Sequence, residues 1–220
     1  MLPLSRLRQA LPTLPRVPLR GPWYRAVNYD HLPGPPPGAP AGSSVQPLWT
    51  GGAALRGARF TPRAAPPHLA STTPAIDSLY LAEDELTPLM EVTSVLRPPG
   101  SGVALVFEPQ VMLTVDGVFT DILDLTVVVN QIALGTTHQE LTGHWSLQQA
   151  IYLAGQGPAP PTQILGRAAF AVSGIIGLRY PSSKNPPAAS LVIFTSKLAP
   201  GQQSLKLYNR PVGKLQQSLP

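Results

Sequence analysis

The chain has 220 residues, of which 28 are proline and 19 are glycine, so that these two types are roughly twice as frequent as in typical proteins. Charged residues make up only 12%, hydrophobic residues make up 43%, and the net charge is +5. These values exclude a wholly disordered chain, the absence of cysteine excludes disulfide scaffolds and cysteine-based sites, and the lack of any run of about 18 apolar residues excludes a membrane-spanning helix.

Residues 1–20 are basic and are interrupted by prolines at positions 12, 15 and 18. They lack the apolar stretch of a secretory signal, and we expect them to form a mobile N-terminal arm of a cytoplasmic protein. Residues 21–200 are long enough for one domain, and residues 201–220 are expected to form a tail with an edge strand. The alternation of large and small side chains over 23–28 predicts the first strand.

Two proline-rich stretches, at about 32–48 and 61–76, are predicted to be exposed loop insertions. Between them, the segment 51–60 is punctuated by glycine and predicts a turn or a strand.

The segment Leu79 to Ala82 predicts a short strand. Asp84 follows it as a candidate N-cap for a helix over 85–96. That helix would place Leu86, Leu89, Met90 and Thr93 on one face.

Alternating residues predict strands over 102–107, 111–115 and 118–123. Asp116-Gly117 lies between the second and third of them and is a strong hairpin signal. The segment 121–134 fits either a strand or a helix.

The last third of the chain predicts helices over 145–154 and 162–172 and strands over 175–180, 190–194 and 205–208. Together the elements predict an α+β domain, with a compact mixed sheet and a few helices.

Familiar catalytic motifs are absent. The four histidines have no carboxylates at metal-ligand spacing, and there is no phosphate-binding loop, no GxGxxG and no GxSxG. Residues 1–29 and 141–220 are basic and free of acids, but their charges do not cluster. A site for a small anionic molecule therefore fits them better than a nucleic-acid surface.

Several blocks follow one another in the order of a known family. They are YRAV at 24–27, RGARF at 56–60, LYLAED at 79–84 with LMEV at 89–92, PTQILGRAAF at 161–170, GLRYPSSK at 177–184 and LVIF at 191–194. In these blocks the chain resembles the RES-domain toxins, which are named for Arg, Glu and Ser positions spread along the sequence. The resemblance covers roughly residues 22–196.

The resemblance implies a fold like that of the diphtheria-toxin group of ADP-ribosyltransferases. It implies NAD as the substrate, cleavage of the nicotinamide–ribose bond, and transfer of the ADP-ribosyl group to water, to phosphate or to a protein. It implies no metal, no membrane, and a cognate helix-turn-helix (Xre-type) antitoxin as the partner, through which any contact with nucleic acid would be made.

Residue roles carry over from the same blocks. Glu91 would stabilise the positive charge that develops on the ribose, and Ser182 would bind substrate or orient Glu91. Arg25 and Arg59 would bind the diphosphate. The NAD-binding set would comprise Arg25, Tyr24, Arg59, Tyr80 and Ser182, with the Tyr80 ring available to stack on nicotinamide.

Three departures from the family pattern bear on activity. Ala58 replaces a usual glycine or serine, Lys184 replaces a common arginine, and either Ser182 or Ser183 could be the family serine, with the spacing from Pro181 favouring Ser182. A catalytically weakened, partner-binding RES fold is therefore an alternative, and a nucleic-acid-binding module is a third.

Overall fold

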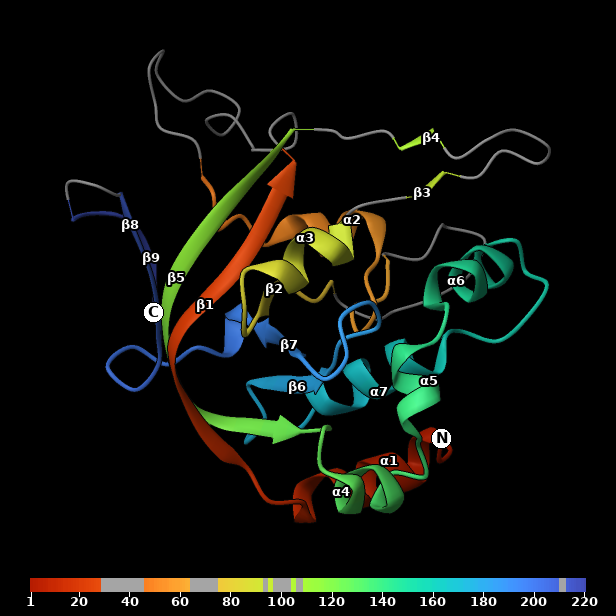
Figure 1. Ribbon diagram of the computed structural model, residues 1–220. Coiled ribbons are helices and arrows are strands. Elements are labelled where there is room, and N and C mark those ends of the chain that lie inside the picture. Colours follow the sequence, from red (N-terminus) through yellow and green to blue (C-terminus); the bar gives the residue numbers. More distant parts are fainter. Residues whose placement is uncertain (29–45, 64–74, 93–94, 97–103, 106–108, 210–212) are drawn as a thin grey trace.

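The structure of the protein is a computed structural model (Figure 1) that describes residues 1–28, 46–63, 75–92, 95–96, 104–105, 109–209 and 213–220. Most of both proline-rich insertions, and most of the strand predicted over 102–107, lie outside the described residues.

The strands are β1 Val17–Asn28, β2 Ser78–Ala82, β3 Val95–Leu96, β4 Ala104–Leu105, β5 Gln110–Asp124, β6 Gly177–Pro181, β7 Ala189–Phe194, β8 Ser204–Asn209 and β9 Lys214–Leu219. The α-helices are α1 Leu4–Ala10, α2 Gly51–Arg56, α3 Leu86–Val92, α4 Val128–Ala133, α5 His138–Thr142, α6 Trp145–Leu153 and α7 Pro161–Phe170, and short 3-10 helices are η1 Leu11–Thr13 and η3 Thr195–Lys197. The predicted α+β class is confirmed.

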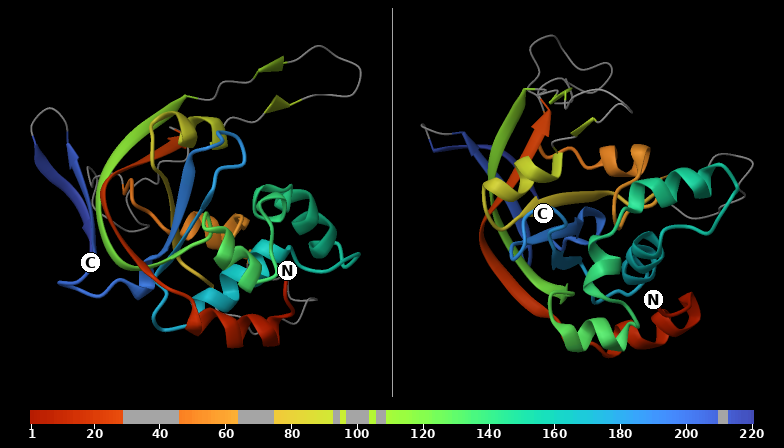
Figure 2. Two further views of the ribbon diagram at one scale, coloured as in Figure 1. Left: turned by 60° about the horizontal axis from the view of Figure 1, so that its bottom comes forward. Right: turned by 45° about the vertical axis from the view of Figure 1, so that its right-hand side comes forward.

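The main sheet has the strand order β1-β2-β7-β6-β5-β8-β9, and β1 also pairs with β5. The first five strands in this order therefore close into a ring. Most of its pairings are antiparallel, but β5 and β6 run parallel. The hairpin of β8 and β9 extends the sheet on one side of the ring, and α5, α6 and α7 gather on the other side (Figures 1 and 2).

Two apolar clusters hold the fold together, one on each face of the central strands. On β7, Leu191 and Ile193 pack with Trp23, Val115 and their neighbours inside the ring. The alternate residues Val192 and Phe194 face the cluster formed with the helices. All six residues of β7 are buried, which explains why all of them except Ser190 are apolar.

The expected mobile N-terminal arm is wrong. Leu7, Leu11 and Leu14 are buried in the helix-side cluster, where they follow helical spacing. The prolines at positions 12, 15 and 18 do not break α1, because all three lie after its end: Pro12 is in η1 and Pro18 is in β1.

The Asp116-Gly117 hairpin is also wrong, because β5 runs straight through both residues. β1 lies antiparallel to β5 over its whole length, and Gly117 lies opposite Gly21. A Cβ at Gly117 would lie 2.7 Å from the rings of both Trp23 and Phe119. Glycine is therefore needed here for ring packing rather than for a turn.

Helix α3 is shorter than predicted and turns a different face inward. It buries Thr87 and Pro88 and leaves Leu86 and Leu89 exposed. The capping prediction is confirmed, since Asp84 Oδ1 accepts hydrogen bonds from the N–H groups of Leu86 and Thr87 at 2.9 and 2.8 Å.

The remaining differences between the predicted and the observed elements lie in two segments whose sequence patterns fit more than one type of secondary structure. The segment predicted as a turn or strand over 51–60 contains helix α2, and the ambiguous segment 121–134 divides into the end of β5 and helix α4. The predicted strands at 79–82, 175–180 and 190–194 and the helices predicted over 145–154 and 162–172 are confirmed, within a few residues of their bounds. The strand predicted over 23–28 is also present, but β1 begins six residues earlier, at Val17. The tail forms β8, as predicted, and β9, which is the edge strand. None of the helices in the described ranges is long and apolar enough to cross a membrane.

Candidate active site

A cavity of about 760 Å³ opens where β1, β2, β6 and β7 meet α2, α3 and the start of α6. This volume is in the range of small-molecule sites. Four charged residues line it, namely Arg25, Arg56, Arg59 and Glu91. The cavity is thus a basic pocket with one carboxylate in its wall.

Glu91 lies in the last turn of α3, where the turn that follows β6 contacts it. Ser182 Oγ donates to Glu91 Oε1 at 2.7 Å, and the Ser183 N–H donates to the same oxygen at 3.0 Å. Ser183 Oγ also donates, at 3.1 Å, to Oε2. Ser182 and Ser183 therefore both donate hydrogen bonds to the Glu91 carboxylate and fix its position at the cavity wall.

Ser182 is a buried linking group rather than part of the cavity surface. It is 1% exposed, does not line the cavity, and accepts hydrogen bonds from the N–H groups of Lys184 and Asn185 at 3.2 and 3.1 Å. Because its hydroxyl accepts from this turn, its proton is directed at Glu91. The structure thus brings Glu91 and Ser182 together as predicted, with Ser182 in an orienting position.

Arg25 reaches the cavity from β1. Its Nε is buried and has no hydrogen-bond partner among the described residues. Burial lowers the pKa of Arg25 to about 10, because removal from water disfavours the charged form. The Arg25 guanidinium is shielded from water and has no hydrogen-bond partner in the described protein, so an anion bound in the cavity would supply the missing partner.

Arg59 lines the same cavity but is already engaged in the protein. Its Nη1 donates to the backbone carbonyls of Leu141 and Gly143 at 2.8 and 2.9 Å, so that it fastens the α5–α6 connection. Arg56, which lies three residues earlier, is exposed at the cavity edge. The sequence blocks contain both arginines but do not show which of them is tied to the protein.

Tyr80 lines the cavity from β2, and its hydroxyl is held at the far end of the ring. The Phe60 N–H donates to it at 3.0 Å, and Thr61 Oγ1 lies 3.0 Å from it. Burial raises the pKa of Tyr80 to about 12, against the opposing effect of these hydrogen bonds, so that the phenol stays neutral. The ring can offer an aromatic face to a ligand.

Tyr24 does not join the site. It is absent from the cavity wall and pairs across the sheet with Thr114 and Ala82. Neighbouring side chains on a strand point to opposite faces, so that Tyr24 and Arg25 do not share a face.

The glycine turn between α2 and β2 is fixed by close packing. Gly57 has φ +80°, and a Cβ there would collide with the side chain of Gln149. Gln163 Nε2 donates to the Ala58 carbonyl at 2.9 Å and to Gln149 Oε1 at 2.7 Å. Ala58 itself needs no left-handed backbone, so its replacement of a family glycine is compatible with this turn.

Lys184 is turned toward α3, where its Nζ donates to the Glu91 carbonyl at 3.2 Å. It does not line the cavity.

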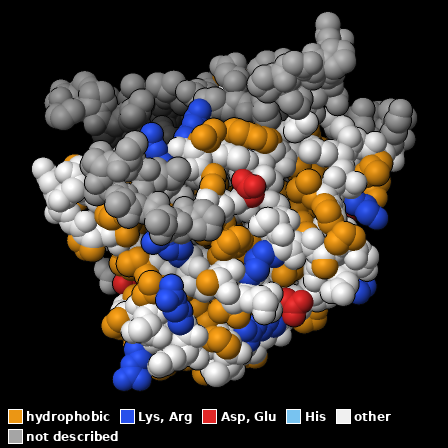
Figure 3. Space-filling model, turned by 180° about the vertical axis from the view of Figure 1, so that it is seen from behind, with side chains coloured by type: hydrophobic (Ala, Val, Ile, Leu, Met, Phe, Trp, Pro, Cys, Tyr) orange, Lys and Arg blue, Asp and Glu red, His pale blue; other side chains and the backbone are white. Residues whose placement is uncertain are grey.

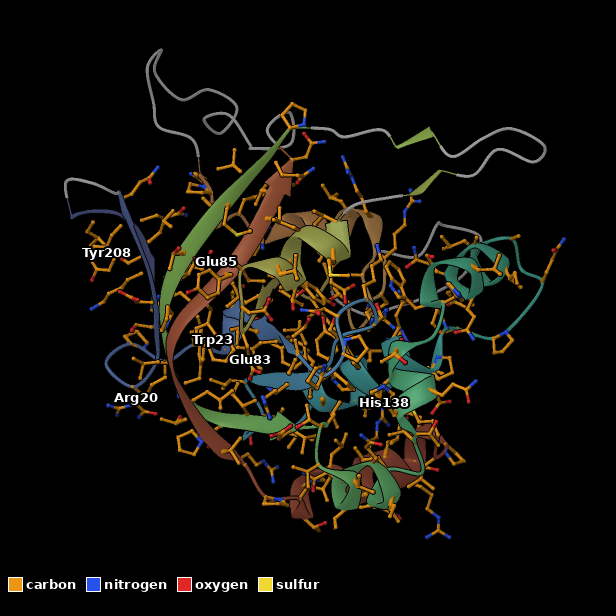
Figure 4. The ribbon with its side chains drawn as sticks, in the orientation of Figure 1. Arg20, Trp23, Glu83, Glu85, His138 and Tyr208 are labelled. Carbon is orange, nitrogen blue, oxygen red and sulfur yellow. The ribbon has the colours of Figure 1, made fainter. Side chains whose placement is uncertain are left out.

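Glu83, which is labelled in Figure 4, belongs to an ion-pair cluster outside the cavity wall. Arg179 donates to the Glu83 carboxylate through Nε at 2.6 Å and to the Asp124 carboxylate through Nη1 at 2.8 Å. The hydrogen bonds that Arg179 donates to Glu83, followed by the one to Asp124, raise the pKa of Arg179 against the effect of burial.

Sequence reasoning missed two tryptophans of the cavity wall, Trp49 and Trp145. Trp49 is 39% exposed, and a Cβ on Gly51 would lie 2.8 Å from its ring. Trp49 lies two residues before the glycine pair Gly51-Gly52, and this spacing was the available signal. No group of three or more His, Asp or Glu side chains in the described part of the chain could hold a metal ion.

Comparisons with known proteins show the family and the fold of this chain. One chain of the crystal structure of the M. tuberculosis MbcT–MbcA toxin–antitoxin complex is similar to this chain, with a TM-score of 0.51 and 17% identity, over 99% of this chain and 93% of that one. No curated protein matches significantly. The RES domain matches residues 24–211, which include Arg25, Arg59, Tyr80, Glu91 and Ser182. The chain therefore belongs to the RES-domain family.

Proposed function

We propose that this protein is the toxin of a toxin–antitoxin pair and that it cleaves the nicotinamide–ribose bond of NAD. One observation carries the proposal: a carboxylate held by two serines forms part of the wall of a cavity whose other charged lining residues are three arginines. Such a site suits a substrate that carries a diphosphate and develops positive charge on the ribose attached to it.

The residues divide this work according to their positions. Arg25 would bind the diphosphate, because its guanidinium has no protein partner in the described chain. Tyr80 would offer its ring to the nicotinamide from β2. Glu91 would stabilise the oxocarbenium-like ribose as nicotinamide departs with the bonding electron pair.

The second step requires an acceptor for the ADP-ribosyl group. Water would give ADP-ribose and one proton, phosphate would give a phosphorylated ADP-ribose, and a protein side chain would give a modified protein. The cavity is large enough for a ligand and a small acceptor together. Comparison of product mixtures formed with and without phosphate distinguishes these acceptors.

The structural neighbour was crystallised as a toxin–antitoxin complex, which supports an antitoxin as the partner of this chain. We propose an Xre-type helix-turn-helix protein, with nucleic acid contacted only through it. On the face in Figure 3, basic side chains are scattered rather than gathered into a stripe, which gives this protein itself no evident nucleic-acid surface there.

Substitution Glu91→Gln tests the proposal. The purified protein should release nicotinamide from NAD, and Glu91→Gln should slow the release by about a hundredfold or more, because a preorganised charge beside the ribose is lost. The measurement is chromatographic quantification of nicotinamide, with inorganic phosphate present or absent.

The matched control is Glu85→Gln, which removes an exposed carboxylate just before the same helix (Figure 4) and should leave the rate unchanged. Equal rates for Glu91→Gln and the wild type would refute the catalytic assignment. Tight binding of NAD without turnover would instead favour the partner-binding alternative.

A further inference from the structure

The turn after β6 is attached to α3 at a second place, distinct from the Glu91 contact. Asn185 Nδ2 donates to Thr87 Oγ1 at 2.8 Å, and Thr87 Oγ1 donates to Asp84 Oδ2 at 2.6 Å. Thr87 is fully buried. We call this pair of side-chain contacts the Thr87–Asn185 bridge.

The direction of each hydrogen bond in the bridge is fixed by proton count. A threonine hydroxyl has one proton, and the Asp84 carboxylate can only accept, so that the Thr87 proton points to Asp84. Thr87 Oγ1 must then accept from Asn185, which requires the NH₂ group of the asparagine to face it. Burial raises the pKa of Asp84, but hydrogen bonds from Thr87 and Leu86 outweigh it and lower the pKa, so that this carboxylate is ionised near neutrality.

The bridge and the Glu91 contact share both of their supporting elements. Thr87 and Glu91 are four residues apart on α3, which places them on one helix face about 5–6 Å apart. Asn185 and Ser182 belong to one turn, in which the Asn185 N–H donates to Ser182 Oγ at 3.1 Å. The Thr87 and Glu91 contacts are one helical turn apart on α3. Together they prevent the loop that follows β6 from rotating about the Ser182–Glu91 hydrogen bond.

We propose that Thr87 and Asn185 are positioning residues, which hold the serine turn in register on α3 so that Ser182 and Ser183 aim Glu91 at the reacting ribose. Neither residue lines the cavity, so that each acts through Glu91. This inference rests on the proposed NAD cleavage. It assigns a catalytic contribution to two side chains that do not touch the substrate.

Kinetics of Thr87→Val, Thr87→Ser and Asn185→Asp test the proposal. Valine keeps the shape of threonine and loses the hydroxyl, so that kcat for nicotinamide release should fall about ten- to a hundredfold with little change in KM, as expected for a misplaced catalytic group. Serine keeps the hydroxyl and should restore kcat. Aspartate cannot donate to Thr87 Oγ1 and should behave like valine.

The matched control is Thr136→Val. Thr136 is also buried, and it donates to a carboxylate, Glu140 Oε2, at 2.7 Å, away from the cavity. This variant should lose thermal stability as Thr87→Val does but keep the wild-type kcat. If Thr87→Val kept the wild-type kcat, changed only KM, or were not rescued by serine, the proposal would be overturned.

Hydrogen–deuterium exchange separates this inference from the proposed function. In the full-length protein, Thr87→Val should speed exchange of the amides in the turn from Ser182 to Ala188, whereas Thr136→Val should not. If the wild type releases no nicotinamide, the proposed function and the catalytic role of the bridge fall together. Unchanged exchange in Thr87→Val overturns the bridge alone, whatever the activity.

Discussion

Arg25 has no ion-pair partner among the described residues, although it lines the same cavity as Glu91. Its Nε is buried without a partner, and burial lowers its pKa to about 10. A buried, unpaired cation weakens the folded state, and its removal is often neutral or stabilising. This loss of folding stability is expected for a residue of the cavity wall whose role is to bind a ligand.

Substitution of Arg25 should therefore separate binding from stability. Arg25→Met should weaken ADP-ribose binding by about 2 kcal/mol, roughly thirtyfold, because hydrogen bonds to a charged group are lost, while the melting temperature holds or rises. Calorimetric titration and thermal unfolding measure the two effects.

Arg20→Met is the matched control, since Arg20 is an exposed arginine on the same strand (Figure 4). It should leave ADP-ribose affinity unchanged. A lower melting temperature for Arg25→Met with intact binding would contradict the role given to Arg25.

At this scale, the family blocks predicted the contact between Glu91 and Ser182, which are 91 positions apart and 2.7 Å from one another. They did not show that Tyr24 lies outside the cavity wall to which Arg25, Ala26 and Val27 contribute. They also could not foresee the bonds of Arg59, because its partners Leu141 and Gly143 lie at and after a helix that no pattern predicted.

Helix α3 joins the site to the surface. Its seven residues present Leu86, Leu89 and Val92 to solvent, and its inner face holds Thr87 and Pro88. So short a helix is not stable by itself. Its position depends on the Asp84 cap and on the contacts of Thr87 and Glu91 with the serine turn.

The Asp84 cap should give α3 an acid-sensitive contribution to stability. Its hydrogen bonds lower the pKa of Asp84 below the ordinary 3.8, so the stabilisation is fully present above that pH and is lost as pH falls through the lower, folded-state value. Asp84→Ala should lower the free energy of unfolding at pH 7 by about 1 kcal/mol. Urea unfolding at pH 7 and pH 3 measures the effect.

The difference between wild type and Asp84→Asn should shrink between these two pH values, because asparagine has no charge to lose. A constant difference would show that ionisation of Asp84 does not support the helix.

Elements were predicted well where the pattern was local and complete, as in β7, whose six residues are all buried. They failed where distant packing outweighed a local preference. Asp116-Gly117 has the sequence of a turn, but pairing with β1 on one edge and β8 on the other keeps β5 extended through it.

For the whole molecule, the N-terminal segment is part of the core. Leu7 and Leu11 are fully buried against residues of α7 and the sheet, and the Leu2 N–H donates to the Leu134 carbonyl at 3.0 Å. Without these residues the helix-side cluster would be exposed to water, although the domain that the sequence predicted began only at residue 21.

Leu7→Ala should lower the free energy of unfolding by about 3 kcal/mol, because a fully buried leucine leaves a cavity. Urea denaturation measures this, with Leu147→Ala as the control, since Leu147 is 64% exposed. A loss below about 0.5 kcal/mol, the range of surface substitutions, would mean that the N-terminal helix is detached in solution.

The closed ring of strands also sets the order in which the molecule can be completed. Tyr80 on β2 pairs with Val192 on β7, and Glu91 contacts Ser182 in the turn after β6. Both sides of the cavity are therefore incomplete until β6 and β7 have been synthesised. At roughly 5–20 residues per second, a ribosome needs about 5 to 20 seconds to travel from Glu91 to the end of β7. For most of that interval Glu91 of the nascent chain has neither Ser182 nor Ser183 to contact, and the cavity wall is complete only when β6 and β7 have been added.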